Sequence, residues 1–115
     1  MNQEPVLKIL MEFGLSKIDA QVYIYLAKKG PQTRENIASA LNINKQRSYR
    51  CLKSLQTKGI VNATFARSTS FSPVPIEKVI DLLIKTKRNQ AQNIQQNKEE
   101  ILTIWESLIS GDQTT

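Results

Sequence analysis

The stretch TRENIASALNINKQRSYRCLKSLQTKG, residues 33–59, decides the fold of this chain. Its apolar residues recur at helical spacing over 34–41 and again over 45–58, with a polar turn at 42–44 between them. Gly59 follows the second helix at the position where glycine commonly ends one. Two short helices joined by so short a turn, the second of them basic, predict a helix-turn-helix.

A residue suited to capping a helix precedes each of the two helices of this motif. Thr33 precedes the first helix and Asn44 the second, and each side chain can accept a hydrogen bond from a backbone N–H of the first turn. Ser16 and Asp19 form a similar pair at the start of an earlier helix, which ends at Gly30. Hydrogen bonding and hydrophobic spacing therefore predict the same helix boundaries.

The pattern changes from helical to alternating directly after this motif. Residues 60–66 and 70–74 are rich in β-forming side chains, and Arg67 lies in the polar turn between them. A short amphipathic helix over 4–13 precedes the other helices. Because a hairpin follows the helix-turn-helix at once, we expect a winged helix-turn-helix over 1–75, mainly α with a small β-hairpin wing.

Residues 76–110 contain no glycine or proline and predict one long helix. Lys87, Gln90 and Asn97 stand where a regular heptad has apolar side chains, so we expect a weak or irregular coiled coil. We interpret this helix as a dimerisation element, because its apolar residues would otherwise be an exposed patch. The alternative is a solvated helix that folds back on its own domain or frays. Residues 111–115 are expected to be a flexible tail. The predicted dimer-interface residues are Ile94, Ile101, Ile104, Trp105 and Leu108.

Composition argues against several classes of function. The 115 residues include one cysteine, Cys51, and no histidine, which removes an internal disulfide and the commonest general base and metal ligand. The adjacent Glu99 and Glu100 point about 100° apart on a helix and do not form a carboxylate pair. We therefore expect no enzyme activity, no cofactor and no metal. No apolar run is long enough to span a membrane and the first residues lack a signal-peptide pattern, so we expect a cytoplasmic protein.

Positive charge is concentrated in the first part of the chain. Residues 1–75 contain 11 Lys and Arg against 4 Asp and Glu, a balance of +7, whereas residues 76–115 contain 5 against 6, a balance of −1. Residues 43–58 carry five of these basic side chains and no acidic one. A basic block on an ordered element favours a polyanionic partner; the alternative is a solvated face that aids solubility.

On a helix over 45–58, Leu52 and Leu55 define the inward face, and Gln46 and Arg50 point the opposite way. Such a helix fits the major groove of double-stranded DNA, where an arginine can bond a guanine through two hydrogen bonds and a glutamine can read an adenine. Nearby cations and cap residues, and the wing tip, are suited to phosphates or a minor groove. The predicted DNA-binding residues are Thr33, Arg34, Asn44, Lys45, Gln46, Arg47, Tyr49, Arg50, Lys53 and Arg67.

Several of these residues also have a structural interpretation. Tyr49 is expected chiefly to close the edge of the core, and Thr33 chiefly to cap a helix. Arg34 is expected to be exposed, with a backbone contact as its DNA role. Arg67 is interpreted equally well as an ordinary turn residue. Cys51 is expected to be a small core residue rather than a redox sensor.

One further pattern spans most of the chain. It is carried by residues 14–23 (GLSKIDAQVY), Gly30-Pro31-Gln32-Thr33, Ile37-Ala38, Ile43, Ser48-Tyr49, Leu52, Lys58-Gly59-Ile60-Val61, Phe71 and Val74-Pro75. From about Leu7 to Leu83 this pattern resembles the winged-helix domain of the TrmB-type family of archaeal transcriptional regulators.

The resemblance implies a dimeric, promoter-binding transcription factor, with the helix over 45–58 as the reader and the C-terminal helix as a dimerising coil. Larger members of the family carry a sugar-binding domain after the winged helix, whereas this chain continues with one helix. A sugar-sensing role is therefore not implied, and a small-molecule effector is not expected. Many members also place a proline at the start of the reading helix, where this chain has Asn44-Lys45.

These features together predict a sequence-specific, double-stranded-DNA-binding transcriptional regulator that acts as a homodimer. The helix over 45–58 would lie in the major groove, and the wing over 60–74 on the flanking backbone or in the minor groove. A nucleoid-type protein would use the same cations without reading sequence. A winged-helix docking module of the transcription machinery would instead present an apolar or acidic face, and the face predicted for this helix is basic.

Overall fold

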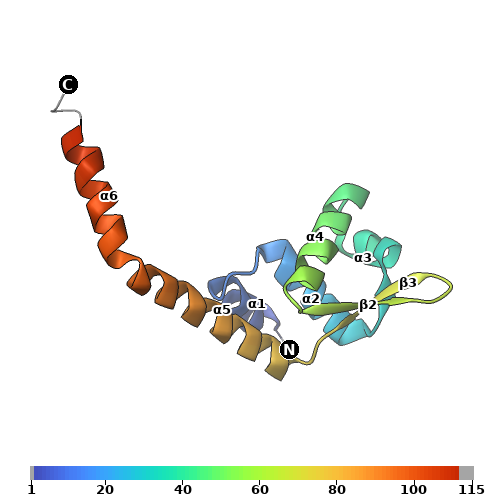
Figure 1. Cartoon of the computed structure of the whole chain (residues 1–115). Coiled ribbons are helices and arrows are strands. Elements are labelled where there is room, and N and C mark those ends of the chain that lie inside the picture. Colours follow the sequence, from blue (N-terminus) through green and yellow to red (C-terminus); the bar gives the residue numbers. More distant parts are fainter. Residues whose placement is uncertain (1, 112–115) are drawn as a thin grey trace. The chain divides into compact units, whose positions relative to one another are not determined.

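The computed structural model describes residues 2–111, which form two compact units, one ending at Leu83 and the other beginning at Ile84 (Figure 1). The predicted order of four helices, a hairpin and a C-terminal helical region is confirmed. In chain order the elements are α1 (Glu4–Glu12), α2 (Lys17–Lys29), β1 (Gln32–Thr33), α3 (Arg34–Leu41), α4 (Lys45–Thr57), β2 (Val61–Phe65), β3 (Thr69–Pro73), α5 (Ile76–Gln96) and α6 (Lys98–Gly111).

The sheet contains one strand more than the sequence predicts. Its antiparallel strands lie in the order β1-β3-β2, so the hairpin strand β3 is central and β1 pairs with it through Gln32↔Phe71 and Thr33↔Ser70. A strand of two residues is too short to show an alternating pattern. It exists because β3 supplies its hydrogen-bonding partners, so only tertiary structure could reveal it.

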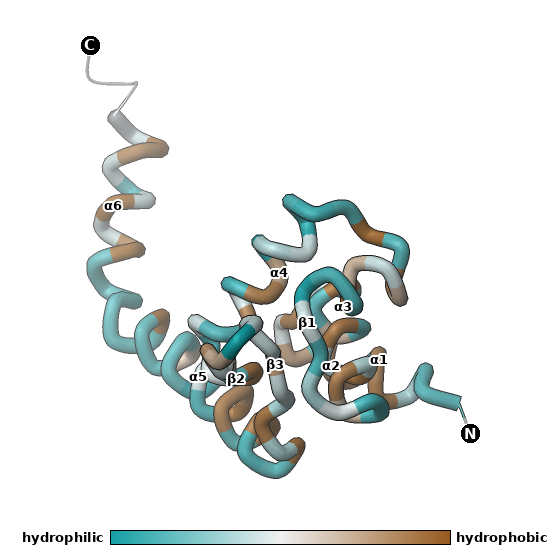
Figure 2. The backbone as a smooth tube through the Cα atoms, turned by 90° about the vertical axis from the view of Figure 1, so that its right-hand side faces the viewer, coloured by the Kyte–Doolittle hydropathy of each residue, from teal (hydrophilic) through white to brown (hydrophobic). Residues whose placement is uncertain are grey.

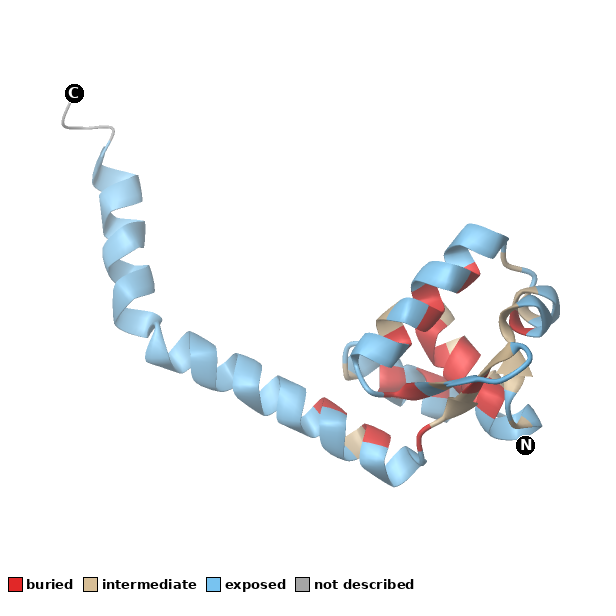
Figure 3. Cartoon of the chain, turned by 45° about the vertical axis from the view of Figure 1, so that its right-hand side comes forward, coloured by how far each residue is buried: buried red, intermediate tan, exposed pale blue. Residues whose placement is uncertain are grey.

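The core of the first unit is built from every helix in it and from the hairpin. Buried residues gather inside this unit, whereas the described residues of the second unit, 84–111, are all exposed (Figure 3). Three of the largest fully buried side chains are Leu26 of α2, Ile37 of α3 and Leu55 of α4. Since these helices share one core, the position of α4 is held from several sides.

The first turns of α5 belong to this core. Val79 is fully buried and Leu83 is 6% exposed, so the first unit extends beyond residue 75. A hydrogen bond of 2.6 Å from the Tyr23 hydroxyl to the carbonyl oxygen of Val74 joins α2 to the end of the wing. This contact fixes the point from which α5 leaves the hairpin.

The second unit is helical but is not one uninterrupted helix. The prediction of a continuous helix over 76–110 is wrong at Asn97, a turn residue between α5 and α6. Asparagine is a poor residue inside helices because its side chain competes for backbone groups. Every described residue from 84 to 111 is exposed. Of the predicted tail, Gly111 ends α6, and residues 112–115 lie outside the described part.

Hydrophobic residues recur along α6 between hydrophilic ones (Figure 2). This amphipathic pattern gives the helix one apolar side and one polar side. None of the described helices has the length and the apolar character that a membrane span requires.

Candidate nucleic-acid interface

The turn between α3 and α4 is closed by two local motifs. Asn42 adopts a left-handed conformation with φ of 54°. The backbone N–H groups of Asn42 and Ile43 donate hydrogen bonds to the carbonyl oxygens of Ser39 and Ala38, respectively, in the last turn of α3. The Asn44 side chain then accepts a hydrogen bond of 2.7 Å from the backbone N–H of Arg47, which caps α4 as predicted. Both motifs are local, and together they set the direction in which α4 leaves the turn.

The C-terminal end of α4 leads directly into the wing. Gly59 has φ of +79°, a conformation that favours glycine, and its N–H donates to the Gln56 carbonyl. The N–H of Ile60 donates to the Leu55 carbonyl at 2.9 Å, and both side chains are fully buried. This pattern is the Schellman motif, in which the residues at the two ends also pack together. The wing is therefore anchored to α4 by hydrogen bonds and by the core.

The two faces of α4 are as predicted. Ser48, Cys51, Leu52 and Leu55 are buried, and the buried Ser48 hydroxyl is satisfied by donating to the Lys45 carbonyl at 2.7 Å. The opposite side is exposed and carries a dense set of donors without an acidic residue. The exposed side chains on it are Lys45, Gln46, Arg47, Tyr49, Arg50 and Lys53.

The structure brings five predicted site residues together at the N-terminal half of α4. A shallow basic hollow, which we call the α4 hollow, is lined by Arg34, Lys45, Gln46, Tyr49 and Arg50. Four of these residues lie on α4, and Arg34 reaches it from the start of α3. Three cations and an amide side chain therefore surround one exposed surface, a composition suited to base edges and phosphates.

Arg34 is not the exposed residue that the sequence predicts. Its side chain is 23% exposed and forms an ion pair with Glu35 at 3.2 Å. The sequence places these two residues side by side on α3 but does not show that Arg34 is partly buried where α3 lies beside α4 and the wing. The pairing with Glu35 offsets part of its charge. Part of the Arg34 charge is therefore already taken up by Glu35 before any polyanion binds.

The interpretation of Tyr49 as a residue that closes the core is wrong. Its side chain is 57% exposed, and the Lys53 ammonium lies 5.9 Å from the centre of its ring. The helical period alone places Tyr49 on the flank of α4, where a small change in packing decides between core and surface. The structure leaves the ring in solvent, next to the cations of α4.

Two further site residues stand where the sequence predicts them. The Thr33 hydroxyl oxygen accepts a hydrogen bond of 3.2 Å from the backbone N–H of Asn36, which confirms it as the cap of α3. Arg67 is exposed in the turn between β2 and β3. The predicted interface residues of the second unit, from Ile94 to Leu108, are exposed on α5 and α6.

The sequence does not predict a polar cluster that joins α2 to α4. The Cys51 thiol donates a hydrogen bond of 3.0 Å to Asp19 Oδ1, and Lys58 Nζ lies 3.8 Å from Asp19 Oδ2. Ser16 caps α2 as predicted, with Asp19 N–H donating to its hydroxyl. The Asp19 carboxylate, however, is used to join α2 to α4. Lys58 thus turns away from the outer face of α4 toward this cluster.

Burial raises the pKa of the Cys51 thiol far above its ordinary value of 9.0, and the hydrogen bond to Asp19 raises this pKa further. Burial also raises the pKa of Tyr23 above 10.0. Both groups therefore keep their protons in the folded protein at pH values where the unfolded chain releases them. The neutral, buried thiol agrees with its prediction as a core residue.

Stability is therefore expected to fall at alkaline pH. Below pH 9 the contribution of Cys51 is fully present, and above it the free energy of unfolding should fall by up to roughly 1 kcal/mol per pH unit from this group. Urea unfolding at pH 8, 9 and 10 measures the slope. The Cys51→Ala variant should show a shallower decline between pH 9 and 10; equal slopes in both proteins would contradict the assignment.

Three comparisons with known proteins agree with this architecture. The family model described as "Sugar-specific transcriptional regulator TrmB" matches residues 10–77. The sugar-sensing transcriptional regulator TrmBL1 of Pyrococcus furiosus is 32% identical over 81 residues, which are 70% of this chain and 24% of TrmBL1. The DNA-binding transcriptional repressor TrmBL2 of Thermococcus kodakarensis is 25% identical over 117 residues, covering 97% of this chain and 44% of that protein. The chain thus spans less than half of the length of these relatives, 24% of TrmBL1 and 44% of TrmBL2.

Solved structures show the same fold. The structure of TrmBL2, described as an archaeal chromatin protein, superposes on 100% of this chain and 45% of its own with a TM-score of 0.76 and 22% identity. A possible transcriptional regulator from Methanosarcina mazei covers 80% of this chain and 83% of its own, with a TM-score of 0.64 and 15% identity. Each of these proteins is described as a regulator or a chromatin protein rather than an enzyme. Because the family model spans more than half of the chain, the chain belongs to the TrmB family of winged-helix, DNA-binding transcriptional regulators.

Proposed function

We propose that this chain is a sequence-specific regulator that binds double-stranded DNA, with α4 in the major groove and the wing on the flanking backbone or in the minor groove. One observation carries the proposal: the outer face of α4 is exposed, basic and free of acidic residues, and it adjoins the wing. An α-helix with such a face fits the major groove of B-DNA.

The placement of the donors supports distinct roles along α4. Arg50 and Gln46 line the α4 hollow at its exposed N-terminal half, where a recognition helix meets base edges. Arg50 is assigned to a guanine and Gln46 to an adenine. Lys45, at the start of the helix, and Lys53, further along, are assigned to phosphates, as is Arg67 at the wing tip.

A second function, nonspecific binding of the chromatin type, is favoured by the likeness to TrmBL2. That protein is described as an archaeal chromatin protein, and its structure superposes on the whole of this chain. The same lysines and arginines would bind phosphates of any sequence through release of counterions. The two functions differ in one measurable property, the ratio of affinities for a preferred and an arbitrary sequence.

Fluorescence anisotropy over a salt series distinguishes these functions. A duplex selected by the protein from a random library is compared with a scrambled duplex of equal length and composition. A regulator should bind the selected duplex about 1000-fold more tightly or better. Equal affinity for both duplexes, lost together as salt rises, would establish the chromatin-type function. No binding to either duplex at low salt would overturn DNA binding altogether.

We further propose that residues 76–110 form a homodimer through the apolar side of α6, next to a winged-helix DNA-binding region over residues 1–75. The exposed apolar side chains of α6, from Ile101 to Ile109, share one side of the helix at helical spacing. Thr103 and Ser110 lie on the other side, where their hydroxyls bond to backbone carbonyls one turn earlier. An uncovered apolar stripe of this kind favours a protein partner, and a second copy offers a matching one.

Replacing Leu108 by alanine should weaken the dimer by about 1–2 kcal/mol, because the side chain is 65% exposed in one chain and would be covered in the pair. Sedimentation velocity at several concentrations measures the change, and the emission of Trp105 on the same helix reports it independently. Thr103→Ala on the opposite side is the matched control. If wild type sediments as a monomer throughout, the apolar side has another partner and the homodimer proposal is wrong.

A further inference from the structure

Phe65 on the wing lies outside the core, although it is on the inward face of strand β2. Strand alternation puts Val61, Ala63 and Phe65 on one face of β2. Val61 is 2% exposed and Ala63 packs against the core, but Phe65 is 79% exposed. The hairpin therefore carries Phe65 past the end of the core while keeping it on the side that faces α4.

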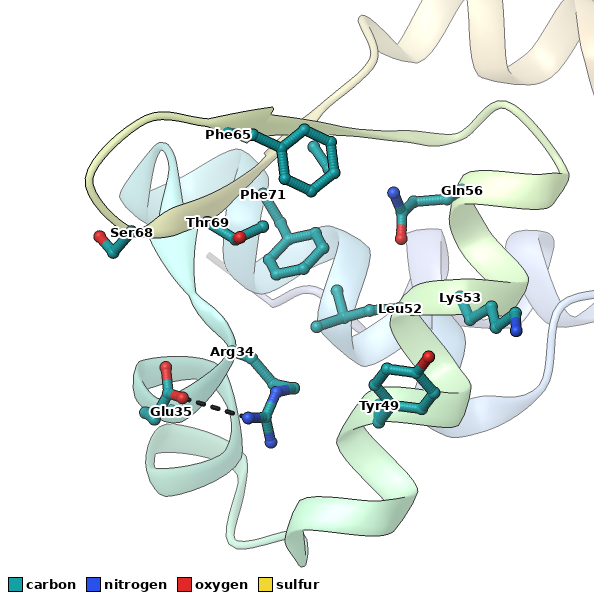
Figure 4. Close-up of a pocket in the computed structure, with 11 residues that line it drawn as sticks. Arg34, Glu35, Tyr49, Leu52, Lys53, Gln56, Phe65, Ser68, Thr69 and Phe71 are labelled. Atoms are coloured by element: carbon teal, nitrogen blue, oxygen red, sulfur yellow. Dashed lines mark hydrogen bonds and ion pairs between the residues drawn. The ribbon is translucent and has the colours of Figure 1, made fainter.

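The space in front of Phe65 is a groove between α4 and the wing, with a volume of about 480 Å³. Leu52 and Phe71 form its apolar floor, and both are buried in the core. Figure 4 shows the Phe65 ring beside that of Phe71, with Tyr49 on α4 below them and the Lys53 side chain extending from α4 away from the two rings, at the edge of the groove. We call this space the wing groove.

Charge on the rim of the wing groove defines what it can hold. Lys53 and Arg34 are its cations, and Glu35 is the one acidic side chain among the described residues that line it. Glu35 is paired with Arg34 at 3.2 Å, so the ammonium of Lys53 is the cation without an ion pair among the lining residues described. An apolar floor beside a positive rim fits a ligand that alternates apolar and anionic groups.

A strand of duplex DNA has this alternation, because each anionic phosphate is followed by a deoxyribose with an apolar face. We infer that Phe65 packs against the deoxyribose of the strand whose phosphate is bound by Lys53, so that the wing contributes an apolar contact as well as a charged one. This inference rests on the proposed function, since it places the same duplex against α4 and β2. It also explains why a large aromatic ring remains uncovered on β2, one of the two outer strands of the sheet.

The salt dependence of binding distinguishes the apolar contact of Phe65 from an electrostatic contact with a phosphate. Phe65→Ala should weaken binding to the selected duplex roughly tenfold to a hundredfold, the loss expected for one buried aromatic ring. The slope of log affinity against log salt should stay unchanged, because no phosphate contact is lost. Lys53→Ala should instead reduce that slope by about 0.9. Thr64→Ala, on the opposite face of the same strand, should have neither effect.

Two further measurements make the test decisive. Phe65→Leu should recover part of the lost affinity because it restores apolar surface, and the unfolding midpoint of each variant confirms that the wing is folded. If wild type binds DNA and Phe65→Ala binds as well as Thr64→Ala, the inference fails while the proposed function stands. If wild type does not bind DNA, the proposed function itself fails. If Phe65→Ala changes the sedimentation of the free protein instead, Phe65 contacts a second copy and the assignment to DNA is wrong.

Discussion

Arg50→Ala is expected to weaken binding to the selected duplex by about 1–3 kcal/mol and to weaken binding to a scrambled duplex much less. The reason is position: Arg50 is exposed on the outer face of α4 and lines the α4 hollow with Gln46 and Tyr49. A guanidinium there can form two parallel hydrogen bonds with one guanine, and alanine forms none.

The informative control for this prediction is Arg50→Lys. Lysine keeps the positive charge but lacks the planar fork that bonds a guanine through two donors. The lysine variant should therefore retain affinity for the scrambled duplex and lose much of the preference for the selected one. Equal losses on both duplexes in the alanine variant, with full recovery by lysine, would show that Arg50 binds a phosphate and that the base is read elsewhere.

Leu55→Ala is expected to lower the free energy of unfolding of the winged-helix unit by about 2–5 kcal/mol, the range for a leucine removed from a packed core. Leu55 is fully buried on α4, and its carbonyl accepts the hydrogen bond from Ile60 that begins the wing. The cavity left by the alanine would lie where α4, the wing and the other helices meet. It should therefore destabilise the whole unit rather than loosen one element.

The chain provides a separate reporter for each unit. Cys51 is buried in the first unit, so its reaction with a thiol reagent reports opening of that unit; Trp105 lies in the second unit, so its fluorescence does not. A urea titration monitored by the reactivity of the Cys51 thiol should show the lower free energy of unfolding of Leu55→Ala. Gln56→Ala, the exposed neighbour on α4, should stay within about 0.5 kcal/mol of wild type. A cost below about 1 kcal/mol for Leu55→Ala would show that the core rearranges to fill the cavity.

Local interactions explain why so much of the first unit could be predicted from sequence. Thr33 and Asn44 cap their helices through backbone groups three residues away. Gly59 ends α4 through its backbone conformation. The inward face of α4 follows from the helical period, which places Leu52 and Leu55 together. Because each signal acts within one or two turns, the order of amino acids alone determined the helix-turn-helix and the exposed basic face.

Contacts between distant residues decided the rest. β1 exists because β3 pairs with it, and Tyr23 bonds Val74, which is 51 residues away. Asp19 looked like half of a helix cap, yet its carboxylate binds Cys51, 32 residues further along. No local pattern reports such partners, because the free energy that forms them comes from packing the whole domain.

Dependence on tertiary packing also explains why the predictions for two site residues, Arg34 and Tyr49, were wrong. Arg34 and Tyr49 lie at the edge of a helical face, where spacing alone does not decide exposure. In the folded chain Arg34 is partly buried, whereas Tyr49 is exposed. Sequence determined which helix presents the basic face, whereas tertiary packing decided which of its flanking side chains reach solvent and placed Phe65 over the wing groove, since exposure depends on what other segments cover.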